Sequence, residues 1–153
     1  FYNIYLPTQD KWTHGPQSLR GALDAILDQL MQVRESSVLK STVIRYGLIG
    51  HDAPHEDICP PPFRCQRLTH QSEGWEDITM RYAQQYCMDN PDHTIVYMHN
   101  KGSFNNNNNN VRIRRITTKA AVSDQCLTIS QQPQQGCNVC ASQLQQSPFF
   151  HYP

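Results

Sequence analysis

The sequence contains no continuous apolar run of 18 or more residues, so no part of it is predicted to cross a membrane as a helix. It carries no net charge, with 13 basic and 13 acidic side chains, and so gives no electrostatic indication of a nucleic-acid or acidic-membrane partner. The pattern of a secretory signal peptide is missing as well. Because the chain begins at Phe1 and has no polar tail at Pro153, we expect a piece of a longer protein.

Short motifs that identify common enzyme classes are also missing. The chain has no GxGxxG or GxxxxGK[ST] phosphate-binding loop, no HExxH zinc motif and no GxSxG nucleophile turn. It has no internal repeat either. Candidate chemistry therefore has to be located from the predicted order of helices and strands.

Cysteine, in contrast, is plentiful for a chain of 153 residues. The six cysteines are Cys59, Cys65, Cys87, Cys126, Cys137 and Cys140. An even number is compatible with three disulfides, which would favour the lumen of the secretory pathway, but also with buried free thiols or a metal site. Cys137 and Cys140 form a CxxC pair, which needs a second pair to make a structural zinc site. The sequence leaves these interpretations open.

The first fifty residues predict a strand, a helix and a second strand. Residues 1–6 are rich in aromatic and β-branched side chains, and Pro7 ends this strand. From residue 19 to residue 33, apolar side chains recur at helical spacing after a Gly-Pro pair that suits a helix start. Residues 42–49 are again rich in strand-forming side chains and precede Gly50. This order predicts a βαβ unit with parallel strands and a right-handed crossover.

The middle of the chain predicts a long connection and a second helix. Residues 51–72 are polar and proline-rich, which predicts a loop that two of the cysteines could pin. A helical stripe follows, with Ser72 or Glu73 near its start and an Asn-Pro pair at its end. The stripe consists of Trp75, Ile78, Thr79, Tyr82, Ala83 and Tyr86.

The remaining residues predict a third strand at 95–98 and a third helix at 111–122. On this helix, Ile113, Ile116 and Ala120 share one face, while Arg112, Arg115 and Lys119 share another. The six asparagines at 105–110 have no apolar content and predict a low-complexity surface loop. Residues 131–153 are rich in Gln, Ser and Pro, which predicts an irregular tail leading into a missing C-terminal part.

These elements predict one α/β domain over residues 1–130, a Rossmann-like three-layer fold with a parallel central sheet. Ligands of such sheets bind outside the carboxyl ends of the strands. Polar residues follow all three predicted strands: Asp10 after the first, His51 and Asp52 after the second, and His99, Asn100, Lys101, Gly102 and Ser103 after the third. The sequence therefore predicts a binding site at this edge.

The third strand end offers the most varied chemistry. Lys101 is a point charge suited to a phosphate, Gly102 permits close approach of the backbone, and Ser103 can donate a hydrogen bond. The alternative is a tight turn whose polar side chains are simply solvated. The arginines after the asparagine run, Arg112, Arg114 and Arg115, could clamp a diphosphate, or could form an ordinary solvated helix face.

At "VYMHNKGSF" and "VRIRRITTKAAVSDQC" the sequence resembles a poorly characterised group of glycosyltransferase-like proteins from algae and other microbial eukaryotes. Their signature is a strand ending in a His-Ser-Lys-Gly-Ser-Phe-like run, then a Leu-Arg-Arg helix and a cysteine. More distantly, the sequence is similar to rhamnan-synthesis proteins. Asn100 departs from the usual serine, and the asparagine run replaces a short polar loop.

The resemblance implies a GT-A-like domain that binds a nucleotide-sugar donor and serves a glycan or protein acceptor. It implies catalytic roles for His99 and Lys101, and ligand contacts for Gly102, Ser103, Arg114 and Arg115. GT-A enzymes commonly hold Mn²⁺ or Mg²⁺ on the sugar diphosphate with an Asp-x-Asp motif, which this chain lacks. The resemblance therefore leaves the metal undefined.

Two functional interpretations follow from the sequence. In the first, the chain is the donor-binding half of a glycosyltransferase-like protein. In the second, it is a non-catalytic binding or structural module, held together by disulfides or a cysteine-based zinc site. The missing Asp-x-Asp motif and the expected truncation at the C-terminal end favour the second interpretation.

Overall fold

A computed structural model describes residues 1–12, 14–100, 102–103, 105 and 107–129 of the chain. The strands are β1 (Tyr2–Leu6), β2 (Ile44–Gly50), β3 (Cys65–Gln71) and β4 (Met98–His99). The helices are the short 3-10 helix η1 (Gln9–Lys11), α1 (Gln17–Glu35), α2 (His55–Ile58), α3 (Asp77–Asp89), α4 (Asn108–Ala121) and α5 (Asp124–Ile129). Among the described residues, no helix combines the length and apolar character needed to cross a bilayer.

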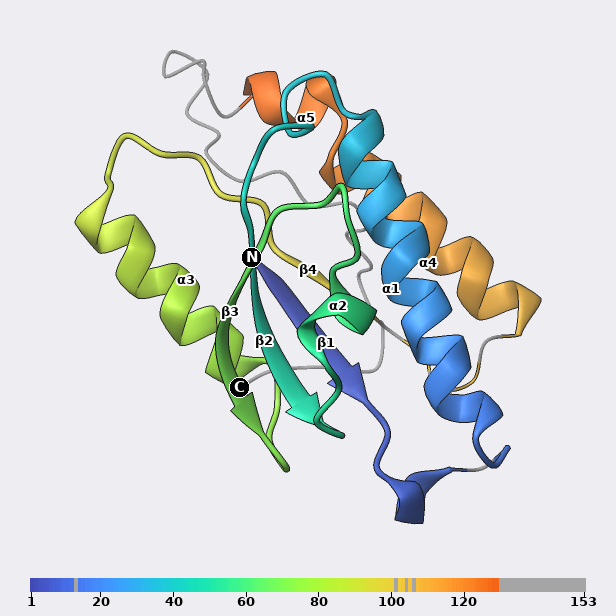
Figure 1. Cartoon of the computed structure of the whole chain (residues 1–153). Helices are drawn as coiled ribbons and strands as arrows, with labels where there is room; N and C mark the ends of the chain where they lie inside the picture. The colour runs from blue at the N-terminus through green and yellow to red at the C-terminus, as the bar shows by residue number, and fades with distance from the viewer. Residues whose placement is uncertain (13, 101, 104, 106, 130–153) are drawn as a thin grey trace, which may run out of the picture.

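The four strands form one sheet in the order β3-β2-β1-β4, and every neighbouring pair is parallel (Figure 1). This confirms the predicted Rossmann-like α/β fold with a parallel central sheet. The two longest pairings join β1 to β2 and β2 to β3, whereas β4 pairs with β1 over two residues only. The carboxyl ends of all four strands therefore lie at one edge.

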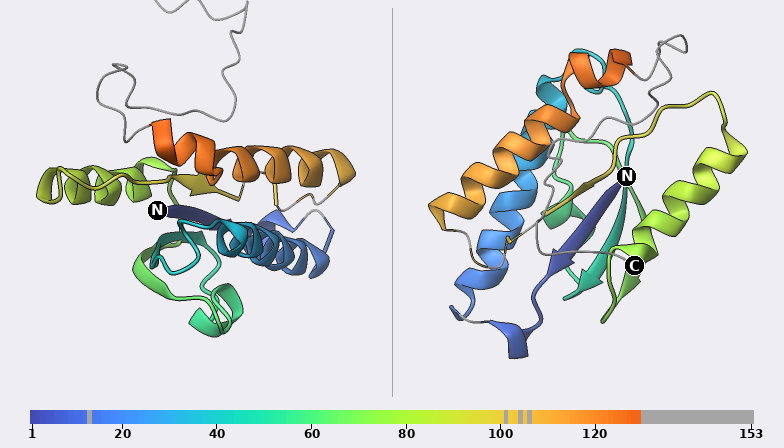
Figure 2. Two further views of the ribbon diagram at one scale, coloured as in Figure 1. Left: turned by 90° about the horizontal axis from the view of Figure 1, so that it is seen from above. Right: turned by 180° about the vertical axis from the view of Figure 1, so that it is seen from behind.

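Helices cover both faces of the sheet. Figure 2 shows α1 and α2 on one side of the strands, with α3 and α4 on the other. On the α1 side, Tyr2, Ile4 and Leu6 of β1 join the apolar core. On the α3 side, Asn3 accepts a hydrogen bond from the Thr79 hydroxyl at 2.7 Å. Alternate residues of β1 thus serve opposite layers, as the two-residue period of a strand requires.

Helix α1 forms where its apolar periodicity predicts it. Its buried residues include Ala22, Ile26, Leu30 and Val33, which recur three or four positions apart and face β1 and β2. The helix begins directly after Pro16 and ends at Glu35. Its position over the sheet brings the polar side chain of Gln29 into the interior as well, where it is almost completely buried.

The segment at residues 51–72 is not the single loop that its composition suggested. It contains α2 and the whole of β3, the edge strand that pairs with β2. Most side chains of β3 are only partly buried, because an edge strand is covered on fewer sides than a central one. This strand lacks the apolar run typical of a buried parallel strand. Its place in the sheet is set by its backbone hydrogen bonds to β2.

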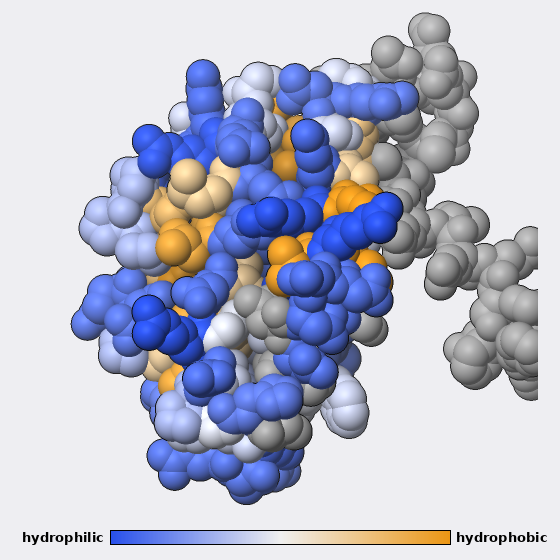
Figure 3. All heavy atoms as spheres, turned by 90° about the vertical axis from the view of Figure 1, so that its right-hand side faces the viewer, coloured by the Kyte–Doolittle hydropathy of each residue, from blue (hydrophilic) through white to orange (hydrophobic). Residues whose placement is uncertain are grey.

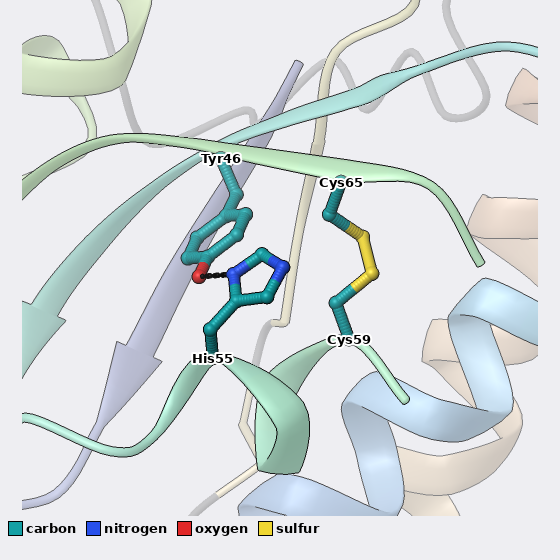
Figure 4. The surroundings of a disulfide bond; sticks show 4 residues. All are labelled: Tyr46, His55, Cys59 and Cys65. Carbon is teal, nitrogen blue, oxygen red and sulfur yellow. Dashed lines mark hydrogen bonds between the residues drawn. A yellow bond between two sulfur atoms is a disulfide. The ribbon is translucent and has the colours of Figure 1, made fainter. Parts of the chain in front are cut away.

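A disulfide joins α2 to β3, between Cys59 and Cys65. In Figure 4 it lies beside Tyr46 of β2, whose hydroxyl is hydrogen-bonded to Nδ1 of His55 at 2.8 Å. Cys126 is also disulfide-bonded, whereas Cys87 is a free thiol. The interpretation that all six cysteines pair in three disulfides within the chain is therefore wrong. Because Cys59 and Cys65 are bonded to each other, they are not zinc ligands either.

Helix α3 starts later than predicted. Its N-cap is Glu76, not Ser72 or Glu73, and Trp75 lies before the helix with 83% of its surface exposed. Only Thr79 and Ala83 of this helix are buried. The apolar stripe predicted from the spacing is therefore correct at Thr79 and Ala83, and wrong at Trp75 and Tyr82, which are exposed.

Helix α4 also differs from its prediction at both its start and its buried face. The asparagine run supplies its beginning, because the Asn107 side chain accepts a hydrogen bond from the Asn110 backbone N–H at 2.9 Å. The buried residues of α4 are Arg114 and Thr118, while Ile113 and Ile116 are exposed. Figure 3 shows this side of the molecule as largely hydrophilic, with apolar side chains in small separate groups.

A buried polar network explains why the polar face of α4 turns inward. The Gln29 amide donates to the Thr118 hydroxyl at 2.7 Å and to the backbone carbonyl of His99 at 3.2 Å. Its carbonyl accepts a hydrogen bond from the Tyr2 hydroxyl at 2.8 Å. One side chain of α1 therefore links β1, β4 and α4. Buried polar groups need such partners, since leaving them unpaired is costly.

We expect Gln29→Leu to lower the free energy of unfolding by about 3 kcal/mol, because it removes the partners of two buried hydroxyls and one carbonyl. Urea denaturation followed by circular dichroism measures this loss. The matched control is Gln32→Leu on the same helix, where the side chain is only partly buried and bonds within its own turn. A loss for Gln29→Leu no larger than for the control would contradict the role of the network.

Candidate functional site

A cavity of about 750 Å³ lies at the carboxyl ends of the strands, on the α3 side of the sheet. Its walls come from β1, β2, β4 and the loops that follow β1, β3 and β4. The lining residues are Asn3, Tyr5, Thr8, Lys11, Ile49, Gly50, Ser72, Glu73, Gly74, Trp75, Glu76, His99, Asn100 and Gly102. We call it the switch-point cavity, because the direction in which strands are added to the sheet reverses here.

The strand order explains why a cavity forms here. From β1 the chain moves outward to β2 and β3, and then α3 carries it back across the sheet to β4 on the other side of β1. The loops after β1 and β4 therefore diverge, and the space between them is left open. In open α/β sheets, ligands bind at such a switch point, outside the carboxyl ends of the strands.

His99 is the last residue of β4, and its side chain contacts that of Glu76 at the wall of the cavity. Its Nδ1 lies 2.5 Å from Oε1 of the Glu76 carboxylate, and the two side chains are 34% and 48% exposed. A carboxylate on Nδ1 favours the tautomer that carries its proton there, which leaves Nε2 as an acceptor. Within the described part of the chain, Nε2 of His99 has no hydrogen-bond partner. An imidazole held in this way can accept a proton at Nε2.

Asn100 lines the cavity, but the polar atoms of its side chain form hydrogen bonds within the fold. Its Oδ1 accepts a hydrogen bond from the Tyr5 backbone N–H at 2.8 Å, and its Nδ2 donates to the Tyr5 carbonyl at 2.8 Å. The same Nδ2 donates to the hydroxyl of Ser103, which is almost fully buried. The Asn100 side chain thus continues the pairing of β4 with β1 for one more residue and holds the adjacent His99 in place.

Two glycines shape the walls where a side chain would not fit. Gly50 ends β2 with a φ of +92°, and a Cβ there would lie 2.0 Å from the Leu6 carbonyl oxygen. Gly74 has a φ of +148°, and its Cβ would lie 2.3 Å from the Ile78 side chain. Both positions need the conformational freedom of glycine. The loops can therefore pass close to β1 and α3 and leave the cavity open.

The charges around the cavity are unevenly placed. The loop after β3 contributes two carboxylates, Glu73 and Glu76, and the exposed indole of Trp75. The segment after β1 contributes the ammonium of Lys11 and the hydroxyl of Thr8. One part of the wall is therefore acidic and aromatic, whereas the part that follows β1 is basic.

The candidates after β1 and β2 do not line the cavity. Asp10 is exposed on η1, where a hydrogen bond with the Thr8 side chain lowers the pKa of its carboxyl. Asp52 forms an ion pair with Arg67 of β3 at 2.7 Å, and this hydrogen bond lowers the pKa of Asp52. His51 precedes it and is partly buried. The structure therefore brings these residues to the same sheet edge but not into the switch-point cavity.

The three arginines of α4 also lie away from the cavity. Arg115 forms a two-pronged ion pair with Asp28 of α1, with contacts of 2.8 to 3.0 Å, and this hydrogen bonding raises the pKa of Arg115. Arg114 is buried, with 2% of its surface exposed, and Arg112 is exposed. None of the three arginines lines the cavity, because Arg114 is buried and Arg115 is paired with Asp28 at the surface.

The remaining candidates of the third strand end have mixed outcomes. Gly102 lines the cavity, Ser103 lies beneath it as a partner of Asn100, and Lys101 lies outside the described residues. Sequence reasoning missed Lys11, Glu73, Trp75 and Glu76. A usable signal existed for Lys11 alone, because it follows directly on the polar residues singled out after the first strand.

The described side chains do not form a metal site. Nowhere in that part of the chain do three or more His, Cys, Asp or Glu groups lie together in a way that could hold an ion. Glu73 and Glu76 line one wall of the cavity. The other candidate ligand there is His99, whose Nδ1 is already paired with Glu76. The donor set does not fit a protein-held Mn²⁺ or Mg²⁺.

A second cavity of about 550 Å³ lies at the opposite, amino-terminal edge of the sheet. Its walls are mainly apolar, with Val33, Ile44 and Val96 among them, and Arg45 lies over the ring of Tyr86 at 4.8 Å from the ring centroid. We favour the switch-point cavity as the functional site, because it combines an oriented histidine with carboxylates, an amine and an aromatic ring at the edge where such folds bind ligands.

Comparison with known proteins gives one family. The family model described as a domain of unknown function, DUF8361, matches residues 1–153. No curated protein and no solved structure matches the chain. An activity has therefore to be inferred from the switch-point cavity itself.

We expect Asn100→Ala to destabilise the protein by about 2 kcal/mol and to expose the Tyr5 amide, because both hydrogen bonds to the Tyr5 backbone are lost. Hydrogen exchange measured by NMR reports the protection of that amide directly. Asn100→Asp keeps an oxygen acceptor for the amide and should retain its protection. Asn90→Ala, at the end of α3, is the control for loss of an amide side chain. Unchanged protection in Asn100→Ala would rule out the strand-extending role.

Proposed function

We propose, for a chain that belongs to the DUF8361 family of domains of unknown function, that the switch-point cavity binds a nucleotide-sugar and supports glycosyl transfer. One observation carries the proposal. A histidine oriented by a carboxylate, His99 with Glu76, stands on the wall of a cavity at the switch point of a parallel sheet. The cavity volume of about 750 Å³ lies within the range of small-molecule and cofactor sites.

The chemistry assigned to His99 is general-base catalysis. Its Nε2 takes the proton of an acceptor hydroxyl while that oxygen forms a bond to the anomeric carbon of the donor sugar. The bond from the anomeric carbon to the diphosphate oxygen breaks, and the nucleoside diphosphate leaves with the electron pair. Glu76 accepts the Nδ1 proton in a hydrogen bond and stabilises the imidazolium that forms.

Cations at the cavity have a separate role. Negative charge develops on the leaving diphosphate, and an ammonium held nearby stabilises it. Lys11 lines the cavity, and Lys101 follows His99 by two positions in the sequence. We assign both amines to the diphosphate, in place of the arginines of α4. The resemblance of the third strand end to glycosyltransferase-like proteins supports the assignment of Lys101.

A second candidate function is a non-catalytic binding or structural module. The Cys59–Cys65 disulfide favours it, as does the use of Asn100 for backbone pairing instead of ligand contact. The two functions differ in a measurable way, because only the first requires binding of a nucleoside diphosphate. Turnover requires His99 as well.

We expect UDP or GDP to bind the chain saturably, and Lys101→Ala to weaken that affinity by at least tenfold, because a charge-assisted contact to a phosphate is lost. Isothermal titration calorimetry measures it, with and without Mn²⁺ and Mg²⁺. Lys119→Ala, on the exposed side of α4, is the matched control and should bind normally. Absence of binding to either nucleotide under all conditions would exclude the donor site and leave the non-catalytic module.

We expect His99→Ala to reduce the rate of sugar release from a nucleotide-sugar by 10² to 10⁴-fold, the contribution typical of a general base, while nucleotide affinity changes little. Chromatographic detection of free nucleoside diphosphate measures this rate. His93→Ala is the control, since His93 lies at the other cavity and contacts Tyr86. Equal rates in the two variants would remove His99 from the mechanism.

A further inference from the structure

We infer that residues 72–76, the loop between β3 and α3, form a subsite for a neutral carbohydrate acceptor, with the indole of Trp75 as its stacking surface. The inference rests on the proposed function and names the substrate class of the same cavity. Three observations carry it: the exposure of Trp75, the charge of its neighbours and the position of the loop next to His99.

Trp75 is exposed, whereas most large apolar side chains that the structure describes are covered. It has 83% of its surface exposed, the highest value among the large hydrophobic residues that the structure describes, and it lines the cavity. The other tryptophan, Trp12, is tied down by a hydrogen bond from its Nε1 to the Pro7 carbonyl at 2.9 Å. An indole left in water at a cavity mouth gains most from a ligand with a flat apolar face.

The neighbours of Trp75 determine which flat ligand fits. Glu73 and Glu76 line the same wall, and residues 72–76 include no basic side chain. Carboxylates repel phosphate groups and acidic sugars, but accept hydrogen bonds from sugar hydroxyls. A pyranose ring has an apolar C–H face for the indole and hydroxyls around its edge for the carboxylates. A neutral sugar therefore matches this wall, and the phosphates of the donor belong near Lys11.

The position of the loop connects this subsite to the proposed reaction. Glu76 follows Trp75 directly and holds His99 by the contact of 2.5 Å described above. Because Trp75 and His99 line the same cavity, a sugar stacked on the indole can present a hydroxyl to the imidazole that would take its proton. The acceptor and the base are brought together by two consecutive residues of one loop.

The test uses two single-tryptophan variants of the whole chain. Trp12→Phe leaves Trp75 as the only tryptophan, and Trp75→Phe leaves Trp12. Each variant is titrated with neutral malto-, cello- and manno-oligosaccharides, with acidic oligogalacturonate, and with UDP and GDP. Emission spectra report contact with the remaining indole, while calorimetry reports nucleotide binding independently.

We expect a neutral oligosaccharide to shift the emission of Trp12→Phe saturably and to leave Trp75→Phe unchanged. Oligogalacturonate should bind more weakly, and Glu73→Gln should reduce that difference. Trp75→Ala should weaken oligosaccharide affinity roughly tenfold, the effect of losing one aromatic contact, without changing the affinity for UDP or GDP.

Two results would overturn the inference while the proposed function stands. One is normal nucleotide binding by calorimetry with no emission response to any neutral oligosaccharide. The other is a shift of Trp75 emission by UDP or GDP alone, which would make the indole a nucleobase platform. Oligosaccharide binding without any nucleotide binding would support the carbohydrate subsite and overturn the transferase proposal instead.

Discussion

The pairing of the Asn100 side chain with the backbone of Tyr5 is the contact on which the site depends. Strand β4 has only two residues in the sheet, and without a further attachment its end would be held by few hydrogen bonds. Asn100 supplies a donor and an acceptor in the places where a strand residue would supply its backbone N–H and C=O. His99 is therefore fixed from both sides, by ladder pairing before it and by the amide after it.

The backbone carbonyl of the same histidine is linked by hydrogen bonds to helices α1 and α4. Gln29 of α1 donates to that carbonyl and to Thr118 of α4, so the helical layers and the end of β4 are linked by one buried amide. The side chain of His99 lines the cavity, while its backbone carbonyl accepts a hydrogen bond in the interior. A side chain placed in this way keeps its orientation at little cost, because the structure that orients it also stabilises the fold.

Much of the fold could be predicted from the sequence, and the failures have identifiable causes. The elements up to β2 follow from periodicity, since α1 and the central strands are buried on defined faces. Strand β3 was missed because an edge strand needs no apolar run, and the inward face of α4 was missed because buried hydrogen bonds, not apolar side chains, fill it. His99 was found because it ends a strand, but its partner Glu76 lies 23 residues away and only the folded chain brings them together.

The asparagine run gives α4 a start that tolerates changes in length. The helix cap is Asn107, four positions before Val111, and six asparagines precede that valine. If the run lost one or two asparagines, four or five would remain, and an asparagine would still stand at the capping position. Only the loop before the cap would shorten, while the register that pairs Arg115 with Asp28 would stay as it is. A repeat of one residue type is thus placed where a change in its length leaves the capped start of α4 as it is.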